Sequence, residues 1–119
     1  INTNRFLKKN SLKNWSIWRK TLTTLRYIVI NKLLNINYDS SGAFRCYNSN
    51  KVKLKDLLKA KNNSYSFFWE SIFILNKKNY KIFEIPIDLP ARLAGVSKMQ
   101  FKDIFSALFY LLLFFFRKN

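Results

Sequence analysis

The chain lacks histidine and contains little cysteine, glycine or proline. Its 119 residues include no His and a single thiol, Cys46. This excludes imidazole acid–base chemistry, an intrachain disulfide and a zinc site built from cysteines. Two glycines and two prolines argue against collagen-like, linker-like and sandwich-like architectures. With no disulfide to form, a reducing, cytosol-facing location is expected.

Acidic residues are also scarce, with 6 Asp+Glu against 22 Lys+Arg and a net charge of +16. Such an excess attracts phosphates, acidic lipids and nucleic acid, although AT-rich coding alone produces part of this composition. The 49% hydrophobic share suits a folded chain of one small domain or a piece of a larger one. The chain begins with Ile1 and shows no signal-peptide pattern, so we expect a fragment.

Hydrophobic spacing predicts an α/β layer structure. The predicted elements are a loop over 1–14, a helix over 16–35, a strand over 43–47, a short helix over 50–60, a buried helix over 65–75, a strand over 80–89 and a helix over 100–116. Pro86 places the second strand at a sheet edge. Two strands do not form a stable sheet alone, which is a second indication of a fragment.

Two of these helices have a predicted inner face. In the first helix the apolar stripe consists of Trp18, Leu22, Leu25, Val29 and Leu33. In the short helix the inward residues are Val52, Leu54, Leu57 and Leu58, with lysines outside.

The last helix is almost wholly apolar from Ile104 to Phe116. At about 1.5 Å per residue this run covers about 20 Å, short of the hydrocarbon core of about 30 Å. Leu and Phe occupy all of its sides, which favours a membrane-interface helix or truncated anchor over a buried core helix or a complete span. Arg117 and Lys118 then reach lipid headgroups.

Two segments offer anion ligands near the middle of the chain. Arg19 and Thr23 lie one helical turn apart, so a guanidinium and a hydroxyl can hold one phosphate; the alternative is a solvated polar face. The turn from Asp39 to Arg45 contains Gly42 and can bring backbone amides to an anion or a sugar; the alternative is an ordinary tight turn.

Two further features carry possible chemistry. Glu70 stands in an aromatic segment and needs a donor or a proton, either as a base or sugar-hydroxyl acceptor or in a structural salt bridge. Arg92, Gly95, Ser97 and Lys98 form a loop that can fold over a diphosphate and neutralise a departing nucleotide. It is not a P-loop. The alternative is a basic loop at lipid headgroups.

Taken together, these patterns resemble a known family. They are Asn14-Trp15-x-x-Trp18-Arg19-Lys20, Asp39-x-x-Gly42-Ala43-Phe44-Arg45-x-Tyr47, the strand from Tyr80 to Ile87, and Arg92-x-x-Gly95-x-Ser97-Lys98. Their order and spacing are similar to the C-terminal half of family 2 glycosyltransferases of the polyprenol-phosphate (dolichol-phosphate) mannosyltransferase type. The resemblance runs from about Arg5 to Lys98.

The resemblance implies a partial GT-A (nucleotide-diphospho-sugar transferase) fold over residues 1–98 that lacks the N-terminal nucleotide-binding half. Residues 99–119 would add the apolar helix. The implied activity is transfer of mannose from GDP-mannose to polyprenyl or dolichyl phosphate, membrane-associated at the cytoplasmic face. A relative that transfers another sugar is the nearest alternative.

The family's ligand roles carry over by position, and no residue is assigned as catalytic. The acceptor phosphate is expected on Arg5, Arg19 and Thr23, the last where the family commonly has Ser. The donor diphosphate is expected on Arg92, Gly95, Ser97 and Lys98. Supporting roles are expected for Asp39, Gly42, Arg45 and Glu70.

The family's Asp-x-Asp metal site precedes the region present here. Asp39 and Asp88 are isolated, so a divalent metal (Mg or Mn) is expected for the complete enzyme with no ligand in this chain. We expect no transferase activity from the chain alone.

The implied partners are a lipid phosphate acceptor, a nucleotide-sugar donor and a membrane surface. A non-catalytic basic membrane-binding module is the rival from another class. Nucleic acid is not expected, because the aromatic residues occupy apolar helical faces rather than an open sheet.

Overall fold

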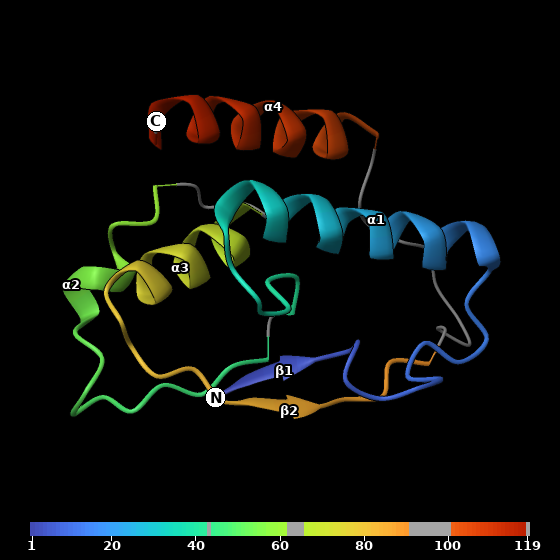
Figure 1. Ribbon diagram of the computed structural model, residues 1–119, viewed down its shortest axis with the longest axis horizontal. Coiled ribbons are helices and arrows are strands. Elements are labelled where there is room, and N and C mark those ends of the chain that lie inside the picture. Colours follow the sequence, from blue (N-terminus) through green and yellow to red (C-terminus); the bar gives the residue numbers. More distant parts are fainter. Residues whose placement is uncertain (43, 62–65, 91–100, 119) are drawn as a thin grey trace.

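The computed structural model describes residues 1–42, 44–61, 66–90 and 101–118 (Figure 1). The elements in chain order are β1 (Asn2–Asn4), α1 (Ile17–Leu34), α2 (Leu54–Leu57), α3 (Ser66–Lys77), β2 (Glu84–Pro86) and α4 (Phe101–Lys118). The two strands form a parallel pair, with Asn2 opposite Glu84 and Asn4 opposite Pro86. In Figure 1, α1 and α3 lie between this pair of strands and α4.

The strand β1 falls where the sequence predicted a loop. Asn2–Asn4 is entirely polar and lacks hydrophobic alternation, and its partner lies at the other end of the chain. The predicted strand over 43–47 is wrong for the described residues 44–47, where Arg45 makes only an isolated antiparallel bridge to Asn2. β2 is shorter than predicted, because its partner has only three residues.

The prediction of a helix over 16–35 is confirmed, since α1 spans Ile17–Leu34. The Ser16 hydroxyl caps its N-terminus by accepting from the Arg19 amide at 3.3 Å. At the other end Asn35 takes the left-handed conformation typical of a helix C-terminus.

The predicted apolar face of α1 is wrong at the N-terminal half of the helix. Trp18 is 73% exposed, and Leu22 and Leu25 are exposed as well. The buried residues are Ile30 and Leu34, because the core lies against the second half of α1 only.

The core joins the C-terminal half of α1 to α3 and to one stripe of α4. Its buried members are Ile30, Leu34, Ile36, Trp69, Ile72, Phe73 and Leu111. The Phe114 ring packs edge-on against Trp69 and Phe73, each with ring centroids 5.1 Å apart. The buried helix predicted over 65–75 is confirmed as α3.

The short helix predicted over 50–60 is reduced to α2, and its predicted inner face is wrong in part. Leu54 and Leu58 are exposed and Val52 and Leu57 are half-buried, whereas Asp56 is buried. The Asp56 carboxylate accepts from the Tyr80 hydroxyl at 2.8 Å and pairs with Lys78 Nζ at 2.9 Å. These partners compensate the carboxylate for the loss of water and hold this side of α2 inward.

The prediction of a C-terminal helix over 100–116 is confirmed by α4, which buries only one stripe. Leu111 is buried, and Tyr110 and Phe114 pack against the core. On the opposite side Phe105 and Phe109 are exposed. Among the helices that the structure describes, none combines the length and the apolar character needed to cross a bilayer.

Candidate functional site

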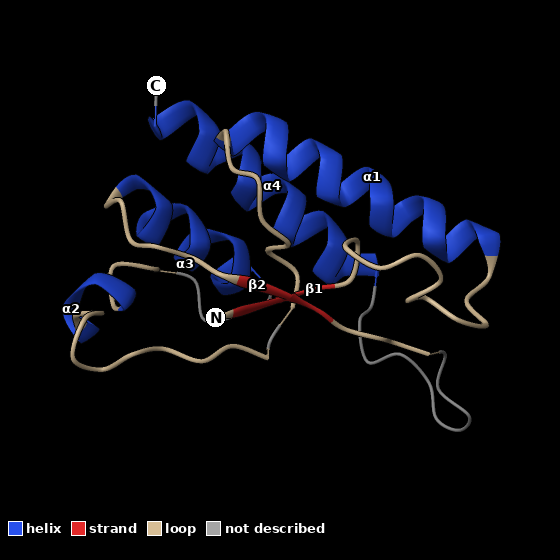
Figure 2. Cartoon of the chain, turned by 60° about the horizontal axis from the view of Figure 1, so that its bottom comes forward, coloured by secondary structure: helices blue, strands red, loops and turns tan. Residues whose placement is uncertain are grey.

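A polar cluster joins β1, β2 and the turn that follows α1. Its members are Asn2, Asn4, Arg5, Asp39, Arg45 and Glu84. The two strands supply one side of the cluster and the turn supplies the other, so residues from distant parts of the sequence meet at one place (Figure 2).

Glu84 connects the strand pair to the turn. Its Oε1 accepts from Asn2 Nδ2 at 3.0 Å and from the Asp39 amide at 2.8 Å, and its Oε2 accepts from Asn4 Nδ2 at 2.7 Å. The sequence analysis assigned no role to Glu84. The only signal for it was an acidic residue within a predicted strand.

Arg45 connects the cluster to α3. Its guanidinium donates to Asn2 Oδ1 at 3.2 Å, Ser71 Oγ at 2.8 Å, and the carbonyls of Ser40 at 3.2 Å and Phe68 at 2.8 Å. These bonds use both terminal nitrogens and Nε within the protein. Arg45 therefore supports the turn, and its contacts here are structural.

Asp39 holds Arg5 at the end of β1. The Asp39 carboxylate is buried and its Oδ2 accepts from the Arg5 amide at 3.0 Å and from Arg5 Nε at 3.2 Å. Within the described part of the chain, the two terminal nitrogens of Arg5 make no hydrogen bond. The guanidinium is thus fixed at one edge and keeps its other donors for a ligand.

α1 brings a second guanidinium to this pair. The Tyr27 ring lies 4.2 Å from the Phe6 ring between centroids, so α1 packs against the residues that follow β1. The adjacent Arg26 is half-buried. Burial lowers the pKa of Arg26, the charge of Arg5 lowers it further, and Asp39 opposes the shift. The sequence analysis assigned no role to Arg26.

The three predicted acceptor-phosphate residues are not joined by a direct contact among the described residues. Arg5 is bound to Asp39, whereas the exposed Arg19 guanidinium lies over the Trp15 ring with Cζ 3.9 Å from its centroid. Thr23 is half-buried, and the spacing of four and three residues puts Arg19, Thr23 and Arg26 on one side of α1. This side leads from Arg19 to the Arg5–Asp39 pair.

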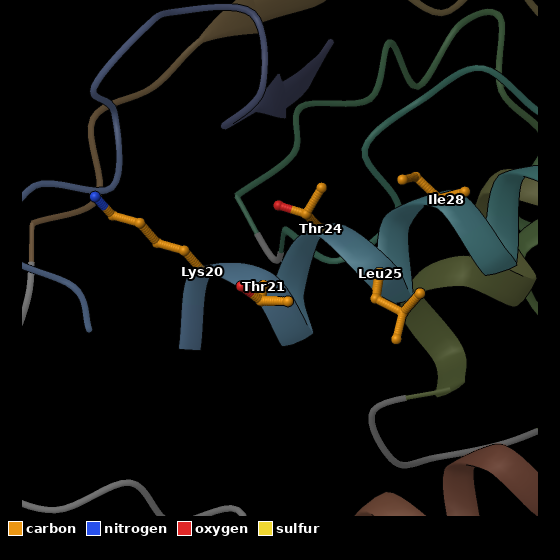
Figure 3. A pocket seen from close by; sticks show the side chains of 5 residues that line it. All are labelled: Lys20, Thr21, Thr24, Leu25 and Ile28. Atoms are coloured by element: carbon orange, nitrogen blue, oxygen red, sulfur yellow. The ribbon is translucent and has the colours of Figure 1, made fainter. Parts of the chain in front are cut away.

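A separate open hollow lies on α1 itself. Its lining consists of Lys20, Thr21, Thr24, Leu25 and Ile28, all from this single helix (Figure 3). In the close-up, Thr24 and Ile28 extend to one side of the helix and Leu25 to the other. The polar groups do not converge, so the hollow has no arrangement suited to a specific ligand.

Glu70 connects α3 to α4. Its buried carboxylate accepts from the Tyr110 hydroxyl at 3.1 Å and from the Lys61 amide at 3.2 Å. Burial first, and then the neighbouring carboxylate, raise the pKa of Tyr110 to about 12. These contacts attach α3 to α4 and to the segment that precedes α3.

The remaining predicted residues divide into two groups. Gly42 lies against β1, where an added Cβ would stand 3.1 Å from Thr3 Oγ1, so a side chain would crowd the strand. The predicted donor loop, with Arg92, Gly95, Ser97 and Lys98, lies outside the described residues.

The described residues do not fit a divalent-metal site. Nowhere in the described ranges do three or more His, Cys, Asp or Glu side chains gather in a way that could hold an ion. Asp39 and Glu84 are neighbours, but their oxygens accept hydrogen bonds from N–H and O–H donors of the protein.

No protein-family model matches the chain, and no solved structure matches it. The likeness to the polyprenol-phosphate glycosyltransferases therefore depends on the motifs quoted above and on no overall similarity.

Proposed function

We propose that this chain is the acceptor-binding part of a family 2 glycosyltransferase that moves mannose from GDP-mannose to polyprenyl or dolichyl phosphate. One observation supports the proposal: three segments that carry the family's motifs, and that lie far apart in the sequence, meet in one polar cluster. Arg5 binds Asp39, and Glu84 accepts from the Asp39 amide. Arg45, from the same turn as Asp39, binds Asn2 beside them.

In the proposed reaction, an oxygen of the lipid phosphate forms a bond to the anomeric carbon of mannose. The bond from that carbon to the diphosphate breaks, and GDP leaves with the electron pair. The phosphate nucleophile is already ionised, so orientation and charge neutralisation dominate over base catalysis. Arg5, Arg19 and Thr23 are proposed to hold the acceptor, with Arg92 and Lys98 at the donor diphosphate. A relative that transfers another sugar uses the same chemistry.

Exposed apolar faces of α1 and α4 support a membrane surface as the place of reaction. The two helices run alongside one another in both views (Figures 1 and 2) and share the core through Ile30 and Leu111. Their exposed apolar residues are Ile17, Trp18, Leu22, Leu25 and Ile28 of α1 and Ile104, Phe105, Leu108, Phe109, Leu112, Leu113 and Phe116 of α4. An apolar surface of this size on a chain with charge +16 suits an anionic bilayer. We place this bilayer at the cytoplasmic face.

Vesicle binding tests the acceptor proposal. Phosphatidylcholine vesicles that contain polyprenyl phosphate should bind the purified chain more tightly than vesicles with the same surface charge from phosphatidylserine. Thr23→Ala should remove this preference. Thr21→Ala is the matched control, because the Thr21 hydroxyl already donates to the Ile17 carbonyl at 2.8 Å within α1.

The rival proposal, a non-catalytic basic membrane-binding module, is favoured by the same exposed apolar faces. It requires only net charge and apolar surface, and it predicts equal, salt-sensitive binding to both vesicle types. Equal binding would overturn the acceptor proposal. Turnover of GDP-mannose by the 119-residue chain alone would instead overturn the proposal that it is only part of an enzyme.

A further inference from the structure

Arg26 is a half-buried cation that makes no ion pair or hydrogen bond in the described part of the chain. The sequence contains 6 Asp+Glu, and all of them lie in the described ranges. Asp39 pairs with Arg5, Asp56 with Lys78 and Asp88 with Lys8. Glu84 is occupied by amide donors, and Glu70 accepts from Tyr110 and Lys61. Asp103 has an interaction of its own, and no described hydrogen bond or ion pair joins any of the six acidic residues to Arg26.

Such an arrangement is unfavourable unless an anion completes it. Taking a guanidinium out of water costs free energy that a carboxylate or phosphate normally restores. Here Arg26 is partly desolvated, and the nearby Arg5 repels it while a single carboxylate, Asp39, serves both. When Arg26 is added to the cluster, three arginines stand against the two carboxylates of Asp39 and Glu84, which leaves one excess positive charge.

The packing of α1 against the residues after β1 fixes the position of Arg26 relative to Arg5. Tyr27 stacks on Phe6, which fixes the register between α1 and the residues after β1. Arg5 is held by Asp39 through Nε, so its terminal nitrogens remain for a ligand. Thr23 lies one helical turn before Arg26 and offers a hydroxyl on the same side.

We propose that Arg26 acts with Arg5 to bind a phosphate group at the junction of β1 and α1. A planar guanidinium can donate two parallel bonds to phosphate oxygens, and two guanidiniums together match a doubly charged phosphate monoester. The assignment of this phosphate to the lipid acceptor rests on the proposed function. Arg26 is then a third arginine of the acceptor site.

Titration of the full chain with farnesyl phosphate, a short polyprenyl phosphate, and with inorganic phosphate tests the inference by calorimetry. Arg26→Gln should weaken binding of farnesyl phosphate by about tenfold or more. The affinity of Arg26→Lys for farnesyl phosphate should lie between those of the wild type and Arg26→Gln, because lysine keeps the charge but cannot donate two parallel hydrogen bonds. Lys32→Gln is the matched control, because Lys32 is exposed on the same helix and its replacement also removes one positive charge. The affinity of this variant for farnesyl phosphate should change less than about twofold.

The outcomes separate this inference from the proposed function. If farnesyl phosphate binds and Arg26→Gln behaves like Lys32→Gln, the role of Arg26 is overturned and the acceptor proposal stands. If only inorganic phosphate binds and Arg26→Gln abolishes it, the anion site stands and the lipid acceptor fails. If neither ligand binds, both fail.

Thermal unfolding without phosphate checks the folded state of the variants. Arg26→Gln should melt at the same or a higher temperature than the wild type, because it removes a half-buried charge that makes no ion pair among the described residues and is repelled by Arg5. If Arg26→Gln does not fold, the comparison of Arg26→Lys with Lys32→Gln decides, and equal binding by these two variants overturns the inference.

Discussion

Replacement of Arg45 by Met should destabilise the chain strongly, because one guanidinium supports β1, the turn and α3 together. The change removes four hydrogen bonds, to Asn2, Ser40, Phe68 and Ser71. At a net contribution of about 1 kcal/mol each, the loss is about 4 kcal/mol. The Phe68 carbonyl keeps the Ser71 hydroxyl as a donor at 3.1 Å, so one acceptor is not left unpaired. Domains of this size are stable by only about 5–10 kcal/mol, so Arg45→Met should lose much of its stability.

Urea unfolding followed by tryptophan fluorescence measures this effect, because Trp69 is 1% exposed and becomes exposed on unfolding. Arg45→Lys should lose about 2 kcal/mol, since an ammonium keeps the charge but cannot reach four divergent acceptors. Lys51→Met removes one exposed charge and should change the free energy of unfolding by less than about 0.5 kcal/mol. An Arg45→Met variant within about 1 kcal/mol of the wild type would refute the assignment of Arg45 as the support of the cluster.

Three further predictions concern pH and the exposed face. The pKa of Tyr110 is raised to about 12 beside Glu70, so its contribution to stability is complete below pH 10.0 and is lost as pH rises toward 12; Tyr110→Phe should abolish this difference in alkaline denaturant unfolding. The pKa of Asp56 is lowered chiefly by its bond to Lys78, so its stabilisation is present above pH 3.8 and is lost as pH falls; Asp56→Asn should flatten that part of the acid unfolding curve. Phe109→Asp, on the exposed side of α4, should reduce partition into anionic vesicles by about 30-fold, from about 2 kcal/mol of lost burial, with an unchanged melting temperature.

The helices were predictable because their signals are local. α1 lies within the predicted range of 16–35, with Ser16 as its N-cap and left-handed Asn35 as its C-cap. α3 follows from an aromatic-rich apolar segment around Glu70 whose side chains favour burial. Capping residues and apolar composition are both local signals, so a short window of sequence predicts each helix.

The strands were less predictable because their pairing is not local. β1 consists of three polar residues, and its extended conformation depends on pairing with the strand Glu84–Pro86. The buried Asn2 and Asn4 side chains donate hydrogen bonds to Glu84, and no periodicity in the sequence predicts these contacts. Tertiary hydrogen bonds, rather than strand propensity, thus determine this part of the fold.

The direction in which α1 faces could not be derived from its hydrophobic stripe. Spacing predicted that Trp18 and Leu22 lie inside, yet both are exposed while Arg26, from the polar side, is half-buried. A helix with apolar residues on more than one side leaves its orientation to whatever packs against it. In this chain the core covers only the second half of α1, so its first half presents apolar side chains outward.

The sequence predicted a binding role for Arg19 and none for Arg26, because only Arg19 lies in a recognisable motif. In the sequence both are arginines on a polar side of one helix, and the motif that contains Arg19 drew attention to it. Only the fold separates them, since the exposed Arg19 guanidinium lies over the Trp15 ring, whereas Arg26 is half-buried and the charge of Arg5 acts on it. Among the described cations, Arg26 alone is partly buried with neither an ion pair nor a hydrogen bond, and that combination arises from packing in three dimensions rather than from any spacing.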